Sequence, residues 1–159
     1  KIKKMAVKNR TQLGSGRNFG DLLDSIVPAL LNVEDVTAAK TLDTDDSGKV
    51  FMLDSAGGAY TITLPAASQL VAGWHCKFIV KEDTPTGDIT INAGSAIVDL
   101  VMKDAGGNAS NSTAGTAKST IVLHTECTQG DYVNIFTDGS TYYAEAMSAI
   151  DDAIDHTAQ

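Results

Sequence analysis

Residues 74–81 read WHCKFIVK, and apolar side chains alternate with polar ones along most of this stretch. The even-numbered positions, from Trp74 to Val80, are all apolar, and Ile79 is the one apolar residue among the odd-numbered positions. A period of two residues is typical of a strand that buries one face. The segment therefore predicts a strand whose even-numbered side chains lie in the core.

Short segments of similar character recur between residues 36 and 148, separated by turns rich in Gly, Ser and Asp. The candidate strands are residues 36–42, 49–54, 59–64, 74–81, 88–92, 96–102, 119–126, 131–136 and 141–147. Short strands at this spacing predict an all-β fold, an antiparallel β-sandwich or jelly-roll-like barrel of about eight strands. The polar, glycine-rich stretch 104–118 predicts a long surface loop.

Charge is distributed very unevenly along the chain. The first twenty residues contain six basic and no acidic residues, whereas residues 21–159 carry six Lys against twenty Asp and Glu, a net charge of −14. The basic residues are Lys1, Lys3, Lys4, Lys8, Arg10 and Arg17. Segregated charges attract oppositely charged surfaces, so residues 1–20 are expected to form an extended basic docking arm. A solvated terminus is the alternative.

The next segment, residues 21–35, is predicted to form a short helix that Pro28 breaks. Leu22, Leu23 and Ile26 fall on one helical face, which packs either against the protein's own core or against a partner. The β-domain is expected to span residues 36–148. An acidic C-terminal tail, 149–159, follows, with a weak helical turn that places Ile150 and Ile154 together.

Residues 43–54 have the ligand spacing of an EF-hand calcium loop, with Asp43, Asp45, Gly48 and Asp54 at the expected positions. The segment 51–58 reads as a strand and then a turn, however, where an EF-hand requires its exiting helix. An acidic turn, in which Asp and Ser side chains bond local backbone amides, is the preferred interpretation. A calcium-dependent adhesion module stays open as a third functional class.

Two His and Cys pairs, His75-Cys76 and His124 with Cys127, invite comparison with a zinc site. Adjacent strand residues, and residues three apart, point to opposite faces, so neither pair converges on one metal. Cys76 is expected to be a buried, reduced thiol. No nucleophile elbow and no phosphate-binding glycine loop is present. The sequence thus predicts a protein that is not an enzyme and that uses no metal or cofactor.

Two classes of partner are not expected. No apolar run approaches the roughly 18 residues of a membrane-spanning helix, so no membrane partner is predicted. The acidic body would repel phosphate, and the basic arm lacks interleaved aromatic residues apart from Phe19, so no nucleic-acid partner is predicted.

Several strand-and-turn segments resemble a β-domain found in tailed-bacteriophage virion proteins, most closely the capsid decoration (cement) proteins. The segments are Lys40-Thr41-Leu42, residues 46–53, Tyr60–Pro65, Ala72-Gly73 with Phe78–Val80, Ile89–Ile91, Gly130–Val133 and Thr137–Tyr143. The resemblance covers residues 36–148. It implies a non-enzymatic homotrimer on the capsid exterior that binds the major capsid protein and bridges neighbouring capsid subunits. In this interpretation the docking residues are the six basic residues of the arm together with Leu22, Leu23 and Ile26.

The alternative is a head- or tail-fibre protein whose β-domain binds a host-surface glycan. Such a protein needs exposed aromatic side chains on which sugars stack. Loop 104–118 contains none. Tyr142 and Tyr143 are the one adjacent aromatic pair, and alternation along a strand buries one of them.

Overall fold

The computed structural model describes residues 32–66, 69, 72–94, 98–103, 109–111 and 118–157. These residues belong to one compact unit, Asn32–Gln159. They form twelve strands and one short 3₁₀ helix, η1 (Thr44–Asp46). The strands are β1 (Val33–Val36), β2 (Lys40–Thr41), β3 (Val50–Leu53), β4 (Tyr60–Thr63), β5 (His75–Val80), β6 (Ile89–Asn92), β7 (Val98–Lys103), β8 (Ala109–Asn111), β9 (Thr120–Leu123), β10 (Tyr132–Thr137), β11 (Tyr142–Met147) and β12 (Ile154–Thr157).

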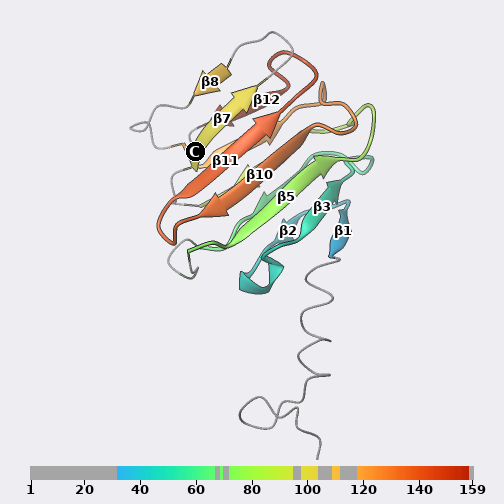
Figure 1. The fold of residues 1–159 in the computed structure, drawn as a ribbon. Coiled ribbons are helices and arrows are strands. Elements are labelled where there is room, and N and C mark those ends of the chain that lie inside the picture. The colour runs from blue at the N-terminus through green and yellow to red at the C-terminus, as the bar shows by residue number, and fades with distance from the viewer. Residues whose placement is uncertain are drawn as a thin grey trace, which may run out of the picture. The chain divides into compact units, whose positions relative to one another are not determined.

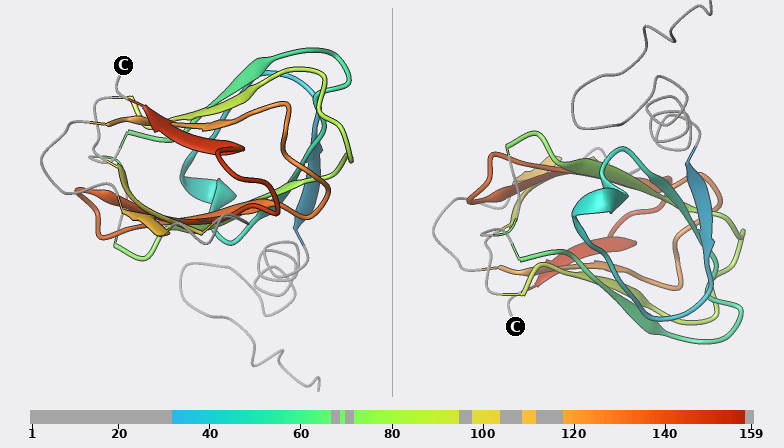
Figure 2. Two further views of the ribbon diagram at one scale, coloured as in Figure 1. Left: turned by 90° about the horizontal axis from the view of Figure 1, so that it is seen from above. Right: turned by 90° about the horizontal axis from the view of Figure 1, so that it is seen from below.

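The strands form two sheets. The larger has the order β1-β3-β5-β10-β11-β7-β8, and Figure 1 looks onto it, with β11, β10, β5, β3 and β1 side by side. The smaller has the order β12-β9-β6-β4-β2. Figure 2 shows the two sheets as separate layers that face each other.

The all-β prediction is confirmed, but both sheets are mixed and not antiparallel. Five of the ten strand pairs are parallel, among them β3 with β5, β7 with β11 and β4 with β6. The number of strands also exceeds the expected eight. Alternation along a strand determines which side chains are buried, whereas the direction of its neighbour depends on long-range connections that alternation does not encode.

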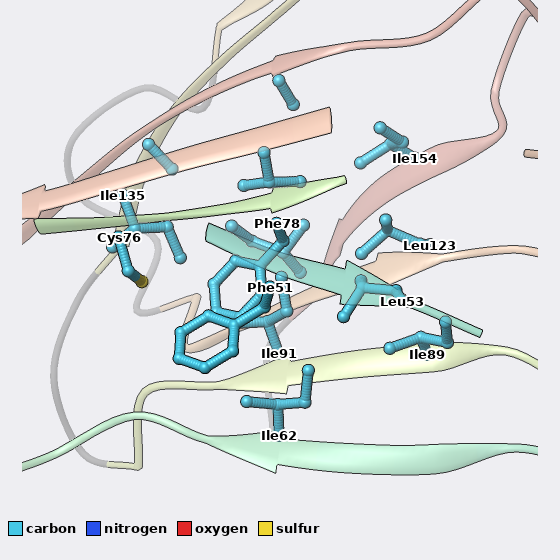
Figure 3. Packing of buried hydrophobic residues seen from close by; sticks show 14 of the residues in the cluster. Phe51, Leu53, Ile62, Cys76, Phe78, Ile89, Ile91, Leu123, Ile135 and Ile154 are labelled. Carbon is cyan, nitrogen blue, oxygen red and sulfur yellow. The ribbon is translucent and has the colours of Figure 1, made fainter. Parts of the chain in front are cut away.

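The hydrophobic core lies between the two sheets. Phe51 of β3 and Phe78 of β5 stack with ring centroids 5.3 Å apart, and Figure 3 shows them beside Ile62 and Ile91. In β5 the residues Cys76, Phe78 and Val80 are buried, as is Trp74 just before it, so the alternation predicted for residues 74–81 is confirmed. Burial of these side chains is the dominant favourable contribution to folding.

Three boundaries differ from the sequence-based expectations. Residues 33–36 form strand β1, which pairs in parallel with β3, so the expected helix does not extend to residue 35. Residues 154–157 form β12, which pairs antiparallel with β9, instead of a helical turn. The expected loop 104–118 contains β8, which pairs with β7. In each case a neighbouring strand supplies hydrogen bonds that a short segment cannot supply for itself.

The acidic turn at residues 43–48 is confirmed. The Asp43 carboxylate accepts a hydrogen bond from the Asp45 amide at 2.9 Å, and the Asp46 carboxylate accepts one from the Asp43 amide at 2.9 Å. This reciprocal arrangement caps η1. Asp46 also pairs with Lys49 at 2.6 Å, and hydrogen bonding to Asp46 raises the pKa of the Lys49 ammonium despite partial burial. These carboxylates therefore have partners within the turn.

Candidate interaction surface

The docking residues predicted from the sequence lie outside the described residues. They are Lys1, Lys3, Lys4, Lys8, Arg10, Arg17, Leu22, Leu23 and Ile26. The candidate surface therefore lies on the β-sheet unit, Asn32–Gln159.

The larger sheet carries one face directed away from the core, which we call the outer face. We define the outer face by Val50 and Met52 of β3, His75, Lys77 and Ile79 of β5, Tyr132, Asn134 and Phe136 of β10, Tyr143, Glu145 and Met147 of β11, and Val101 and Lys103 of β7. In β5, β10 and β11 these residues alternate with buried ones, which places them on the side of the sheet opposite the core.

The outer face carries several exposed apolar side chains. Among the described residues, five large hydrophobic side chains are exposed, and Val101 (55%), Phe136 (51%) and Met147 (44%) belong to this face. Val33 of β1, at the edge of the same sheet, is 63% exposed, and Ile150 follows shortly after β11. Three of the five exposed hydrophobic side chains therefore lie on this one face, which makes it the candidate interaction surface.

The outward side of the smaller sheet is different. Its central strands β4 and β6 carry Thr61, Thr63, Thr90 and Asn92 at the positions that alternate with buried residues. These side chains need no covering, because they hydrogen-bond water. The two outer surfaces of the protein thus differ in chemistry, and the larger sheet supplies the apolar one.

One end of the outer face is aromatic. The rings of Phe136 and Tyr143 stack, with centroids 5.1 Å apart and planes inclined by 17°, because the two residues are opposite each other in the β10–β11 pair. The Tyr143 hydroxyl donates to the Asp138 carboxylate at 3.1 Å. Hydrogen bonds from the backbone amides of Thr141 and Ser140 lower the pKa of Asp138 to about 2. Asp138 therefore stays ionised and holds the Tyr143 ring in place.

The middle of the outer face is polar and charged. The Lys77 ammonium lies 4.2 Å from the centroid of the Tyr132 ring, a cation–π contact. The Asn134 amide donates to the Glu145 carboxylate at 3.3 Å. Asn134 is opposite Lys77 on one side and Glu145 on the other, so a cation and an anion flank it in one row across three strands.

A shallow hollow of about 280 Å³ borders the outer face near Tyr132 and Met147. Its lining includes Asp131, which is 5% exposed. The Asp131 carboxylate accepts hydrogen bonds from the amides of Thr128 and Ala149 at 2.9 and 2.8 Å and from the Ser148 hydroxyl at 3.0 Å. Three donors satisfy this carboxylate, so its role is to hold the chain before β10 against the chain after β11.

The His and Cys pairs have separate environments. His75 is exposed and its Nδ1 lies 2.9 Å from the Gly73 carbonyl, whereas Cys76 is buried, and burial raises the pKa of its thiol. The Cys127 thiol donates to the Ala153 carbonyl at 3.2 Å, and burial, the largest cause, raises its pKa to about 12. Both thiols are therefore protonated and poor nucleophiles at neutral pH.

His124 lies between two carboxylates that come from other segments. Its Nδ1 is 3.2 Å from Asp88 and its Nε2 is 3.2 Å from Asp155. Burial lowers the pKa of the imidazole, but hydrogen bonds to Asp155 and Asp88, and the charges of both, outweigh burial and raise it. Within the described ranges, no group of three or more His, Cys, Asp or Glu side chains is placed to hold a metal ion.

Sequence reasoning missed the outer face because its residues come from separate strands. Alternation predicts that one of the two adjacent tyrosines is buried without saying which, and in the structure Tyr142 is buried whereas Tyr143 is partly exposed. Its partner Phe136 was not recognised. The turn Asp138-Gly139-Ser140 between two alternating segments was the available signal, because a hairpin register across it brings Phe136 opposite Tyr143.

In the part of the chain that the structure covers, no helix is long and apolar enough to cross a membrane. A comparison of the chain with models of known protein families gives no match, and a search of curated proteins gives none either.

Proposed function

We propose that this protein is a non-enzymatic structural component of a phage virion that binds the outer surface of the capsid and bridges major capsid subunits. The observation that carries the proposal is the separation of charge: six basic and no acidic residues in positions 1–20, against a net charge of −14 in the rest of the chain. The resemblance of residues 36–148 to capsid decoration proteins supports the same function. That resemblance adds a sandwich-like β-domain and a homotrimeric assembly to the proposal.

The basic arm provides the attachment in this proposal. Each exposed ion pair contributes about 0.2–1 kcal/mol and weakens as salt screens it. Several such pairs acting together, repeated over many copies on one shell, make dissociation slow although each contact is weak. The acidic body keeps decorated particles apart by mutual repulsion.

The test is co-sedimentation with undecorated capsids across a salt series. Reversing Lys3, Lys4, Lys8 and Arg10 to Glu is expected to abolish binding and to leave the β-sheet unit folded. The matched control reverses Lys77, Lys81, Lys103 and Lys118 to Glu, which changes the net charge by the same amount outside the arm. Full occupancy by the arm variant, or equal loss in both variants, would contradict the arm as the anchor.

A second candidate function is glycan binding by a head- or tail-fibre protein. The stacked pair of Phe136 and Tyr143 favours it, since a sugar ring packs against exposed aromatic rings and hydrogen-bonds nearby polar groups such as Asn134 and Glu145. Titration of a panel of host-surface oligosaccharides, monitored by NMR, tests this function. Saturable shifts that Phe136→Ala removes would favour the fibre over the capsid protein.

A further inference from the structure

The outer face has a pattern of side chains that is complementary to itself. Three rows cross the central strands β5, β10 and β11 in register. The rows are His75, Phe136 and Tyr143; Lys77, Asn134 and Glu145; and Ile79, Tyr132 and Met147. Strand β10 lies in the middle of each row, with a cation on one side of Asn134 and an anion on the other.

This pattern has a consequence for two copies that pack outer face against outer face. A two-fold axis that lies between the copies, along β10, places β5 of one copy against β11 of its partner. Lys77 then faces the partner's Glu145, and Glu145 faces the partner's Lys77. Ile79 faces the partner's Met147. The next strands outward are β3 and β7. Val50 of β3 is opposite Lys77, and Val101 of β7 is opposite Glu145, so Val50 faces the partner's Val101.

The charges also favour this axis over one at right angles to the strands. A two-fold axis at right angles to the strands would place Lys77 against the partner's Lys77 and Glu145 against the partner's Glu145. Like charges in direct opposition are costly in an interface. Two-fold contacts use the same patch on both copies, so a patch must complement itself, and the outer face does so about the axis along β10.

We propose that the outer face is a contact surface for a second copy of this chain, packed about a two-fold axis along β10. The contact is independent of capsid binding. It links copies in pairs, so any three-fold contact must use a different surface. Neighbouring strands lie about 4.8 Å apart, and successive rows lie about 7 Å apart along a strand. Three rows across the five strands β3, β5, β10, β11 and β7 therefore cover roughly 450–500 Å² per copy. This area is at the low end for specific interfaces, so we expect a weak dimer that forms at high concentration.

The first experiment is sedimentation equilibrium of the full chain, at physiological salt, from about 10 µM to about 1 mM, a range in which contacts of this size associate. Wild-type protein is expected to dimerise, or to form an even-numbered assembly of dimers. Lys77→Glu and Glu145→Lys are each expected to weaken this association at least about tenfold, because each creates two like-charge contacts per dimer. The double variant K77E/E145K exchanges the charges and is expected to restore it. Thr61→Glu, on the smaller sheet, is the control and is expected to have no effect.

A second measurement reports the geometry directly. Asn134 lies on the proposed axis, so the Asn134 residues of two copies are about 10 Å apart, the distance between packed sheets. A short bis-maleimide is expected to cross-link N134C into a covalent dimer but to leave T61C monomeric, since Cys76 and Cys127 are buried. A monomer throughout the concentration range, no restoration by the charge exchange, or cross-linking of T61C alone would overturn the proposal. Association that the basic arm causes would instead respond in opposite directions to the two single variants, because Lys77→Glu makes the body more acidic and Glu145→Lys makes it less acidic. The proposed contact is weakened by both.

Discussion

At the residue scale, Gly87 is the position where the absence of a side chain matters most. A Cβ atom there would lie 2.2 Å from the Ala59 amide nitrogen and 2.6 Å from the Gly58 carbonyl carbon, both of them backbone atoms. The segment around Gly87 is also held to the β3–β4 turn, because the Thr86 and Gly87 amides donate to the Ser55 hydroxyl at 3.0 and 3.3 Å. Neither side of this contact can move away at low cost.

We therefore expect Gly87→Ala to lower the free energy of unfolding by about 2–4 kcal/mol. Gly57→Ala is the matched control, because the nearest atom to a Cβ there is the Thr37 carbonyl oxygen at an ordinary 3.7 Å. This control is expected to be neutral or to stabilise the protein by up to about 1 kcal/mol. Urea unfolding followed by circular dichroism measures both. Equal stability of the two variants would contradict the close approach at Gly87.

At the scale of elements, β12 shows how tertiary contacts override local pattern. The sequence pairs Ile150 with Ile154 on one side of a helical turn. In the structure Ile154 is fully buried, at 0% exposed, because β12 pairs with β9, whereas Ile150 is 41% exposed. The two isoleucines therefore have opposite environments although they are four residues apart.

The substitution Ile154→Ala is expected to cost about 2–5 kcal/mol of stability, because it removes buried methyl groups and leaves a cavity. Ile150→Ala makes the same chemical change and is expected to stay within about 0.5 kcal/mol of wild type. Thermal and urea unfolding of the pair test the position of β12. A helical turn that buries both isoleucines would instead make the two costs similar.

The attachment of β12 also depends on pH. His124, which directly follows β9, bridges Asp155 of β12 and Asp88 next to β6, and these carboxylates raise the pKa of the imidazole above its ordinary value of 6.5. A raised pKa means that the folded state binds the proton more tightly than the unfolded state. The resulting stabilisation is complete below pH 6.5 and is lost as pH rises through the pKa of the folded protein.

We expect the difference in free energy of unfolding between wild type and His124→Gln to shrink as pH rises from about 5 to about 8.5, a range in which His titrates and free carboxylates stay ionised. NMR titration of the His124 ring gives its pKa directly. A difference that stayed constant across this range would show that burial cancels the effect of the two carboxylates, and a pKa below 6.5 would show that burial outweighs it.

At the scale of the whole molecule, the β-sheet unit has a core of its own. Every buried hydrophobic residue among those described lies between Val36 and Ile154. Residues 32–159 carry six Lys against eighteen Asp and Glu, a net charge of −12, so this unit is more acidic than the complete chain at −8. A unit with its own core is expected to fold by itself.

Deletion of residues 1–31 is therefore expected to leave the urea midpoint and the cooperativity of unfolding unchanged, while it removes the binding to capsids proposed above. Circular dichroism and co-sedimentation on the same preparation measure the two properties separately. Loss of a cooperative transition in the shortened protein would show that the N-terminal segment is part of the folded core, and the arm could then no longer be treated as a separate docking element.

Much of the all-β character could be predicted from alternation alone. The buried positions of β4, β5 and β11 follow the period of two, and the turn at residues 43–48 follows from its Asp and Ser content. The parallel pairs could not be predicted, because both directions of a neighbouring strand accept the same alternating pattern. Strands β1, β8 and β12 were missed because they are short and lie at the edges of their sheets, where local preference is weak.

The amino-acid sequence by itself determined which face of each central strand is buried, where the principal turns lie, and that basic and acidic charge are separated along the chain. These are local properties, and they depend on side-chain type and on the two-residue period of extended chain. Only the tertiary structure decided that Phe136 stacks on Tyr143, that Lys77 and Glu145 flank Asn134, and that Val101, Phe136 and Met147 are exposed on one face. Those neighbours come from strands up to some seventy residues apart, and only strand order and register, set by packing of the whole core, bring them together.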